Sequence, residues 1–283
     1  NLMIHPMPYI ATCRAGMLSP TGRCRTFSAD ADGYCRAEGC GAIVLTRQTV
    51  DANGVPDTSE HPCYGMIRAC AVNQDGRSAG LTAPNGLAQQ AMHKRALELA
   101  GNLKPSDVSV IETHGTGTAL GDPIEVSAIN AVYGNDSERE IPLVLGAVKT
   151  NVGHLEAAAG MAGLIKLILS LAHRHVPANL HMEEVNPAIN FDGLSAVLPG
   201  TGGIELKGTL AENNLLIGGV SSFGFGGTNA HVLVESVDPS CNNATGNNAN
   251  QPLYGEPASY DRQQFSWKPV TLEKNVAGRN MPV

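Results

Sequence analysis

Hydrophobic and polar positions alternate along this chain in a way that separates strands from helices. Short apolar runs rich in β-branched residues predict strands at 64–72, 108–112, 144–148, 215–221 and 231–235. Longer stretches with helical spacing predict helices at 87–100, from Asp122 onward, and after Asn151 through Arg174. Strands that alternate with helices predict an α/β fold built on a central sheet.

The remaining segments carry weaker signals. Residues 1–41 are rich in Gly, Pro, Cys and Arg and predict loops, followed by a short buried strand at Ala42–Leu45. Residues 51–62 predict a turn-rich linker, and residues 238–283 a polar linker and tail. At the second helix, Asp122 is expected to be the N-cap, with Pro123 in the first turn and Glu125 completing a capping box.

Composition narrows the function classes. The 283 residues are 42% hydrophobic and 16% charged, which suits a globular protein with a real core. A formal net charge of −7 argues against a nucleic acid as partner. The apolar stretch at 155–172 is interrupted by Glu156 and Lys166, which favours a buried helix over a membrane span.

The cysteines argue for an intracellular protein. There are seven, an odd number with irregular spacing, which does not predict a disulfide framework. No CxxC pair occurs, so no metal site of the usual zinc spacing is expected. We therefore expect most of the cysteines to be reduced and buried, in a cytoplasmic protein.

Three segments place polar side chains among small residues at predicted strand ends, where active sites of α/β sheets usually lie. In the first, ETHGTGT, His114 follows a strand and is flanked by glycines. A neutral imidazole there can donate a hydrogen bond to an oxyanion, although the His can also simply cap a turn. The stretch lacks the GxxxxGK[ST] pattern, so a Walker-type phosphate loop is not predicted.

The second segment, KTNVGH, brackets a turn with Lys149 and His154. A lysine close to a histidine lowers the pKa of the imidazole and keeps it neutral, as a hydrogen-bond donor requires. Taken alone, Lys149 could equally be a solvated surface charge.

The third segment is GGVSSFGFGGTNAH, in which glycines expose backbone N–H groups and Phe223 and Phe225 offer an apolar wall. That combination predicts an oxyanion hole with a movable gate, the alternative being an ordinary glycine-rich hairpin with its aromatic rings in the core. The segment does not contain GxSxG, so a serine-hydrolase elbow is not predicted.

Together the motifs HGTGTALGDPIE, KTNVGHLEAAAGMAGLIK and GGVSSFGFGGTNAHVLVE closely resemble three signatures of the β-ketoacyl synthase family, in the family's order. NQDGRSAGLTAPNG is similar to a segment typical of modular polyketide synthases, and DGYCRAEG resembles the family's DGxxRGEG stretch, with Ala37 where glycine is usual. The resemblance covers residues 1 to about 236 and implies a thiolase-like fold with αβαβα layers.

The resemblance implies a condensing acyltransferase of polyketide or fatty-acid synthesis. A cysteine thiolate holds an acyl chain, and a carrier-bound malonyl-type extender loses CO₂ and attacks it. His114 and His154 would support decarboxylation and Lys149 would tune His154. Phe223, Phe225 and Gly226 would form the gating and oxyanion loop, and Thr116 and Thr118 would contact phosphopantetheine.

The resemblance also implies the organisation and partners of the chain. Residues 1–57 are expected to be the end of the family's N-terminal half, 58–237 its complete C-terminal half, and 238–283 a linker. No cysteine lies in the DTACSS-like context of the family's nucleophile, and neither Cys13 nor Cys35 is assigned that role. The expected partners are an acyl carrier protein, which brings its own phosphopantetheine, the rest of the N-terminal half, and a second copy of the parent; no intrinsic cofactor is expected.

Two other functions could use the same motifs. A ketosynthase-like module that only holds acyl carriers has less need of His114, Lys149 and His154. A degradative thiolase would be expected to carry a second cysteine in this half in place of the GFGGTN loop. The sequence on its own therefore favours an enzyme fragment that is inactive as given but derives from a competent parent.

Overall fold

The computed structural model describes residues 1–47, 49, 63–78, 80, 83–208, 214–237, 273–274 and 280–281. The chain divides into two compact units, residues 1–246 and 247–283. Within the second unit, β9 (Glu273–Lys274) pairs antiparallel with β10 (Asn280–Met281). The predicted linker at 51–62 lies outside the described residues.

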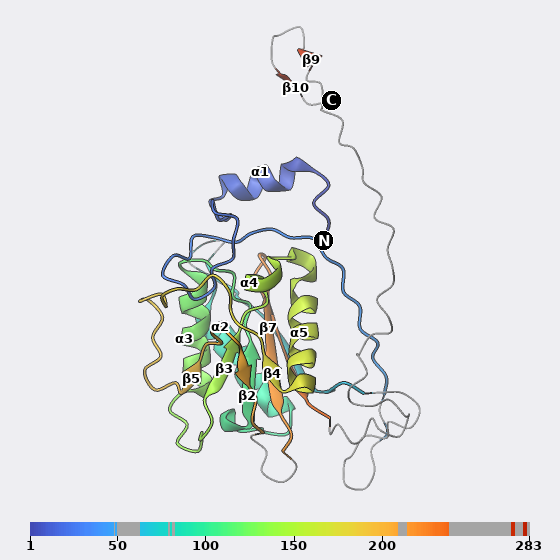
Figure 1. Cartoon of the computed structure of the whole chain (residues 1–283), viewed down its shortest axis with the longest axis vertical. Coiled ribbons are helices and arrows are strands. Elements are labelled where there is room, and N and C mark those ends of the chain that lie inside the picture. The colour runs from blue at the N-terminus through green and yellow to red at the C-terminus, as the bar shows by residue number, and fades with distance from the viewer. Residues whose placement is uncertain are drawn as a thin grey trace. The chain divides into compact units, whose positions relative to one another are not determined.

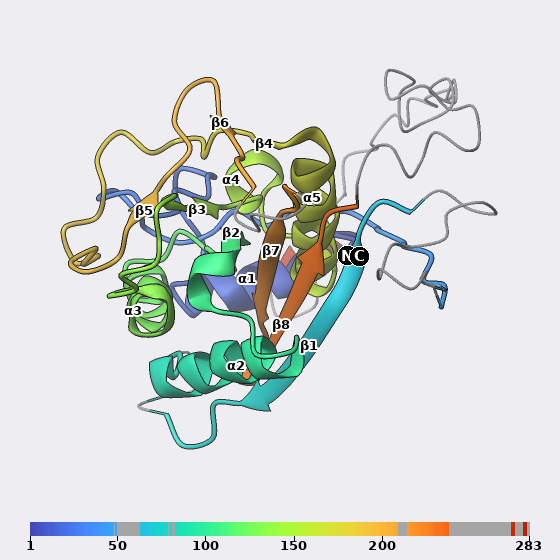
Figure 2. The same ribbon diagram turned by 90° about the horizontal axis from the view of Figure 1, so that it is seen from below.

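A six-stranded mixed sheet organises the first unit, in the order β1-β8-β7-β2-β3-β5 (Figures 1 and 2). The parallel part pairs β2 with β7 and β3, and β3 with β5. The antiparallel part pairs β8 with β7 and β1. The strands are β1 (Met66–Gln74), β2 (Val108–Glu112), β3 (Leu143–Gly146), β5 (Ala196–Val197), β7 (Ile217–Phe223) and β8 (Thr228–Glu235). The predicted α/β class is therefore confirmed.

Helices cover both faces of this sheet (Figure 2). On one face α2 (Gly86–Leu99) and α3 (Gly121–Tyr133) enclose the larger core cluster with β1, β2, β3, β7 and β8. On the other face α5 (Ala159–His173) packs Leu164, Leu167 and Leu171 against Val110 and Val220. The shorter elements are α1 (Pro6–Arg14), α4 (Lys149–Val152), the 3-10 helices Pro105–Asp107 and Glu156–Ala158, and the pair β4 (His175–Val176) with β6 (Ile204–Glu205).

Small residues let α5 lie very close to β7. A Cβ added at Gly160 would come within 2.9 Å of Ser222 Oγ, and one added at Gly218 within 2.5 Å of Leu167 Cδ1. Larger side chains would push the helix away from the strand. The small residues at the start of α5 therefore allow the helix to pack closely on β7.

Three predictions about local structure were wrong. Residues 6–14 form α1 instead of a loop, with the His5 side chain capping the helix. Ala42–Leu45 is not a strand: Val44 is 92% exposed, and no strand pairs with it among the described residues. The helix expected after Asn151 starts later than predicted, at Ala159, because Gly153 adopts a φ of +80° and interrupts the helical backbone.

Residues 156–173, which include α5, are the one described helical stretch that is long and apolar enough to cross a membrane by length and composition. A core helix passes the same test, and Leu164, Leu167 and Leu171 pack in the core. The stretch is therefore weak evidence for a membrane span.

Candidate active site

The carboxyl ends of three neighbouring parallel strands bring the predicted segments together. His114 follows β2, α4 with Lys149 follows β3, and Phe223 is the last residue of β7. Because β2 lies between β7 and β3 in the sheet, these ends meet at one edge. Strand order alone therefore gathers residues that lie up to 109 positions apart in the chain.

His114 is held by its Nδ1 atom. The backbone N–H of Phe223 donates to Nδ1 across 3.3 Å, and Lys149 Nζ lies 3.4 Å from the same atom. Lys149 Nζ also donates to the His114 carbonyl oxygen. Because Nδ1 accepts, a neutral ring carries its hydrogen on Nε2.

His154 has the same tautomer for a similar reason. The backbone N–H of Glu156 donates to His154 Nδ1 across 2.8 Å, which leaves Nε2–H as the donor. The rings of His114 and His154 lie 5.6 Å apart, centroid to centroid, at 85° to each other. The Tyr34 ring covers His154 at 4.8 Å.

Burial and charge keep both imidazoles neutral. Burial, the Lys149 ammonium and His154 together hold the pKa of His114 well below its usual value. Burial, assisted by Lys149, lowers the pKa of His154 to about 3. The pKa of Lys149 itself is lowered by burial, against the opposing effect of nearby carboxylates led by Glu125. The site thus presents two neutral N–H donors at neutral pH.

Two buried carboxylates support the His114 loop, although the sequence pattern predicted a different task for them. Glu125 accepts the backbone N–H groups of His114 at 2.7 Å and Gly115 at 2.8 Å. Asp122 accepts those of Phe27 at 2.9 Å and Gly117 at 3.1 Å. The predicted capping box was therefore wrong, because α3 begins at Gly121 and both carboxylates turn toward the preceding loop. Burial raises the pKa of Glu125 to about 7 and that of Asp122 to about 6.

The glycine-rich loop between β7 and β8 is a short hairpin turn. Phe223 lies against His114, with ring centroids 5.2 Å apart. Phe225 is 55% exposed, so only Phe223 forms the expected apolar wall. Gly226 is anchored through its carbonyl oxygen, which accepts Gln74 Nε2 across 3.2 Å.

The two threonines of HGTGT bind each other. Thr116 Oγ1 and Thr118 Oγ1 lie 3.1 Å apart, and Thr118 Oγ1 also accepts the backbone N–H of Gly121. Both side chains keep part of their surface exposed. Their contact with phosphopantetheine stays a prediction.

Most of the described cysteines are not buried, contrary to the expectation. Of the six described, only Cys24 is buried, Cys35 and Cys63 are partly exposed, and Cys13, Cys40 and Cys70 are exposed. Burial raises the pKa of the Cys24 thiol to about 11, so this cysteine is a poor nucleophile. Within the described ranges, no three His, Cys, Asp or Glu residues are grouped to hold a metal ion.

Comparison with known families decides the identity of this site. Residues 1–50 match the family described as "Beta-ketoacyl synthase, N-terminal domain", and residues 64–183 match "Beta-ketoacyl synthase, C-terminal domain". The chain belongs to the β-ketoacyl synthase family. His114, Lys149 and His154 all lie within the stretch that matches the C-terminal domain.

Relatives of this ketosynthase chain are polyketide synthases. It is 46% identical over 238 residues to a polypeptide of the phenolphthiocerol/phthiocerol polyketide synthase of Mycobacterium tuberculosis, covering 84% of this chain and 12% of that protein. It is 44% identical to "Polyketide synthase GfsA" of Streptomyces halstedii, covering 84% of this chain and 3% of that protein. These relatives support the assignment to a ketosynthase domain of a modular polyketide synthase.

Solved ketosynthase structures confirm the thiolase-like fold. The "Ketosynthase from module 6 of the bacillaene synthase from Bacillus subtilis 168" superposes with a TM-score of 0.74 at 35% identity. The superposition covers 84% of this chain and 41% of that one. The ketosynthase chain described here thus spans well under half of a solved ketosynthase.

Proposed function

We propose that this ketosynthase chain provides the decarboxylation and enolate-binding half of a condensing site in polyketide synthesis. The observation that carries the proposal is the pair of neutral imidazoles, His114 and His154, whose rings lie 5.6 Å apart with both Nδ1 atoms already accepting hydrogen bonds. Two fixed Nε2–H donors suit an oxygen on which negative charge develops.

The chemistry follows from that pair. A carrier-bound malonyl-type thioester loses CO₂, and the electrons of the broken carbon–carbon bond form an enolate. Nε2–H of His114 and of His154 donate to the enolate oxygen, so no proton needs to be transferred at this step. The enolate carbon then attacks an acyl thioester on a cysteine, forming a carbon–carbon bond and releasing the thiolate.

The remaining roles are part of the same proposal. Lys149 donates to the His114 carbonyl oxygen, and its charge adds to the effect of burial in lowering the pKa of both rings. The loop of Phe223, Phe225 and Gly226 would admit the acyl thioester, and Thr116 and Thr118 would line the path of the carrier's phosphopantetheine. Cys24 is not proposed as the acyl-bearing thiolate, since it is 2% exposed.

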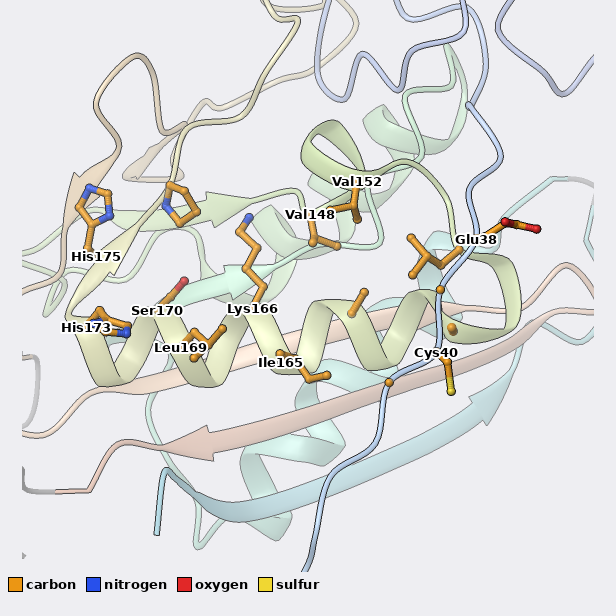
Figure 3. A pocket seen from close by; sticks show the side chains of 16 residues that line it. Glu38, Cys40, Val148, Val152, Ile165, Lys166, Leu169, Ser170, His173 and His175 are labelled. Atoms are coloured by element: carbon orange, nitrogen blue, oxygen red, sulfur yellow. The ribbon is translucent and has the colours of Figure 1, made fainter. Parts of the chain in front are cut away.

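The partners proposed are an acyl carrier protein and the rest of a ketosynthase fold, in a cytoplasmic dimer. A groove along α5 supports the rest of a ketosynthase fold as a partner (Figure 3). This groove of about 590 Å³ is lined mainly by apolar side chains such as Ile165 and Leu169 and, at its edges, by polar ones such as Glu38 and His173. The chain matches only 41% of a solved ketosynthase, and an apolar face of this kind is expected to be covered in the complete fold.

The proposal is tested in the ketosynthase polypeptide that contains this chain, by the release of CO₂ from a malonyl-loaded carrier protein. His114→Ala is expected to lower this rate by about 100-fold or more, the scale of removing one oxyanion donor. The matched control is His181→Ala, because His181 is exposed and lies outside both the site and the groove. Decarboxylation that is unchanged in His114→Ala would favour a module that only holds carriers.

A further inference from the structure

The backbone of Glu156 adopts a conformation that side chains avoid. Its φ is +48°, in the left-handed region where a Cβ crowds the backbone. Glu156 is also the residue whose N–H donates to Nδ1 of His154. A backbone strained next to a functional group must be held there by its surroundings.

Arg36 holds Glu156 in this conformation through an ion pair. Its Nε donates to Glu156 Oε1 across 2.6 Å and its Nη2 donates to Oε2 across 2.9 Å, a two-pronged ion pair. The Arg36 side chain is only 3% exposed, and its guanidinium carbon lies 4.7 Å from the centre of the Tyr9 ring. A planar guanidinium that stacks on a ring and binds both carboxylate oxygens fixes the carboxylate in one position.

The residues on either side of Arg36 also form backbone hydrogen bonds with His154. The backbone N–H of His154 donates to the Cys35 carbonyl oxygen across 2.7 Å, and that of Ala37 donates to the His154 carbonyl oxygen across 2.9 Å. Arg36 and His154 therefore form an isolated parallel β-bridge. Arg36 thus contacts both His154 and Glu156, although it precedes Glu156 by 120 positions in the chain.

We propose that Arg36 is a positioning residue that, through its two-pronged pair with Glu156, sets the tautomer and direction of the His154 ring. The ion pair keeps Glu156 in its left-handed conformation. That conformation aims the Glu156 N–H at Nδ1, so that Nε2–H faces the substrate. The positioning of the ring is argued from these contacts alone. The expected effect of Arg36 on catalysis rests on the proposed role of His154.

The test measures the reactivity of His154 as well as the rate of decarboxylation, in the whole ketosynthase polypeptide. Diethyl pyrocarbonate acylates an imidazole nitrogen that has a free lone pair, and mass spectrometry of peptides reports each histidine separately. Arg36→Met is expected to free Nδ1 and speed acylation of His154, with His114 unchanged. Decarboxylation should fall by on the order of tenfold to 100-fold, the cost of a small misplacement.

A second substitution distinguishes positioning from general damage. Glycine adopts φ near +48° without a steric cost, so adding Glu156→Gly to Arg36→Met should restore slow acylation and most of the activity. Arg95→Met is the matched control, because Arg95 forms an exposed ion pair with Glu98.

The two readouts separate this inference from the proposed function. Faster acylation of His154 in Arg36→Met with full activity would support the positioning role and overturn the proposed catalytic role of His154. Unchanged acylation, or no recovery on adding Glu156→Gly, would overturn the positioning role whatever the activity.

Discussion

Glu112 at the end of β2 and Lys166 in α5 form a buried ion pair, with 2.8 Å between Oε2 and Nζ. The other carboxylate oxygen, Oε1, accepts the backbone N–H of Val148, the residue before α4. One carboxylate therefore joins the strand that leads to His114 with the segment that carries Lys149, and α5 supplies its countercharge.

Lys166→Met tests this connection. The change leaves a 2% exposed carboxylate without its countercharge, and we expect the free energy of unfolding to fall by about 3–5 kcal/mol. Urea unfolding of the ketosynthase polypeptide measures it. The double variant Glu112→Gln/Lys166→Met should lose less than Lys166→Met alone. The exposed pair of Lys104 and Glu138 provides the control, because Lys104→Met should leave the unfolding midpoint unchanged.

Packing of α5 on the sheet gives a second prediction. Gly218→Ala places a methyl group 2.5 Å from Leu167 Cδ1, and we expect a loss of about 1–3 kcal/mol in unfolding free energy. Gly200→Ala is the control, because nothing lies within 4 Å of its added methyl. Equal unfolding midpoints for the two variants would show that the helix and strand are not in close contact.

A third prediction concerns acid stability. His93 is fully buried against His231, with ring centroids 4.4 Å apart, and burial lowers its pKa to about 3. Between pH 6.5 and about 3 the unfolded chain binds a proton at His93 that the folded chain does not, so stability is present above pH 6.5 and is lost as the pH falls.

His93→Gln removes the group at which the unfolded chain binds this extra proton. The slope of unfolding free energy against pH, measured between about pH 6 and 5 in urea titrations, should be shallower by about 1.4 kcal/mol per pH unit than in the unchanged protein. His173→Gln, at the exposed end of α5, is the comparison. A slope that is the same in all three proteins would mean that His93 does not resist protonation in the fold.

The exposed groove along α5 gives a fourth prediction. The isolated 283-residue chain is expected to self-associate through this face, as light scattering after gel filtration would detect. Leu169→Lys should reduce the association, whereas Leu87→Lys, on the 75% exposed start of α2, should not. A soluble monomer with well-dispersed amide signals would contradict this expectation.

Most strands of the sheet could be predicted from the sequence because they are short apolar runs bounded by turn residues. Strands β1, β2, β3, β7 and β8 were all located, and their order brings the predicted His114 and Lys149 together. The short apolar run at Ala42–Leu45 was misread, because a local pattern does not reveal whether a neighbouring strand exists.

The supporting contacts of the site were beyond a local reading. Glu125 looked like a capping residue because it stands three positions after Asp122, yet its carboxylate is drawn to the N–H groups of the His114 loop. Arg36 and Glu156 are separated by 120 positions, so only the folded chain shows that they meet. The left-handed backbone of Glu156 has no sequence signal, since such positions normally favour glycine.

The central claim is that His114 and His154 stabilise the enolate together. The most direct measurement is product formation by the ketosynthase polypeptide, followed by mass spectrometry with an acyl primer and a malonyl-loaded carrier. His154→Ala should still accept the acyl primer but form condensation product about 100-fold or more slowly, because one of the two Nε2–H donors is gone. Condensation at the unchanged rate in His154→Ala would contradict the account.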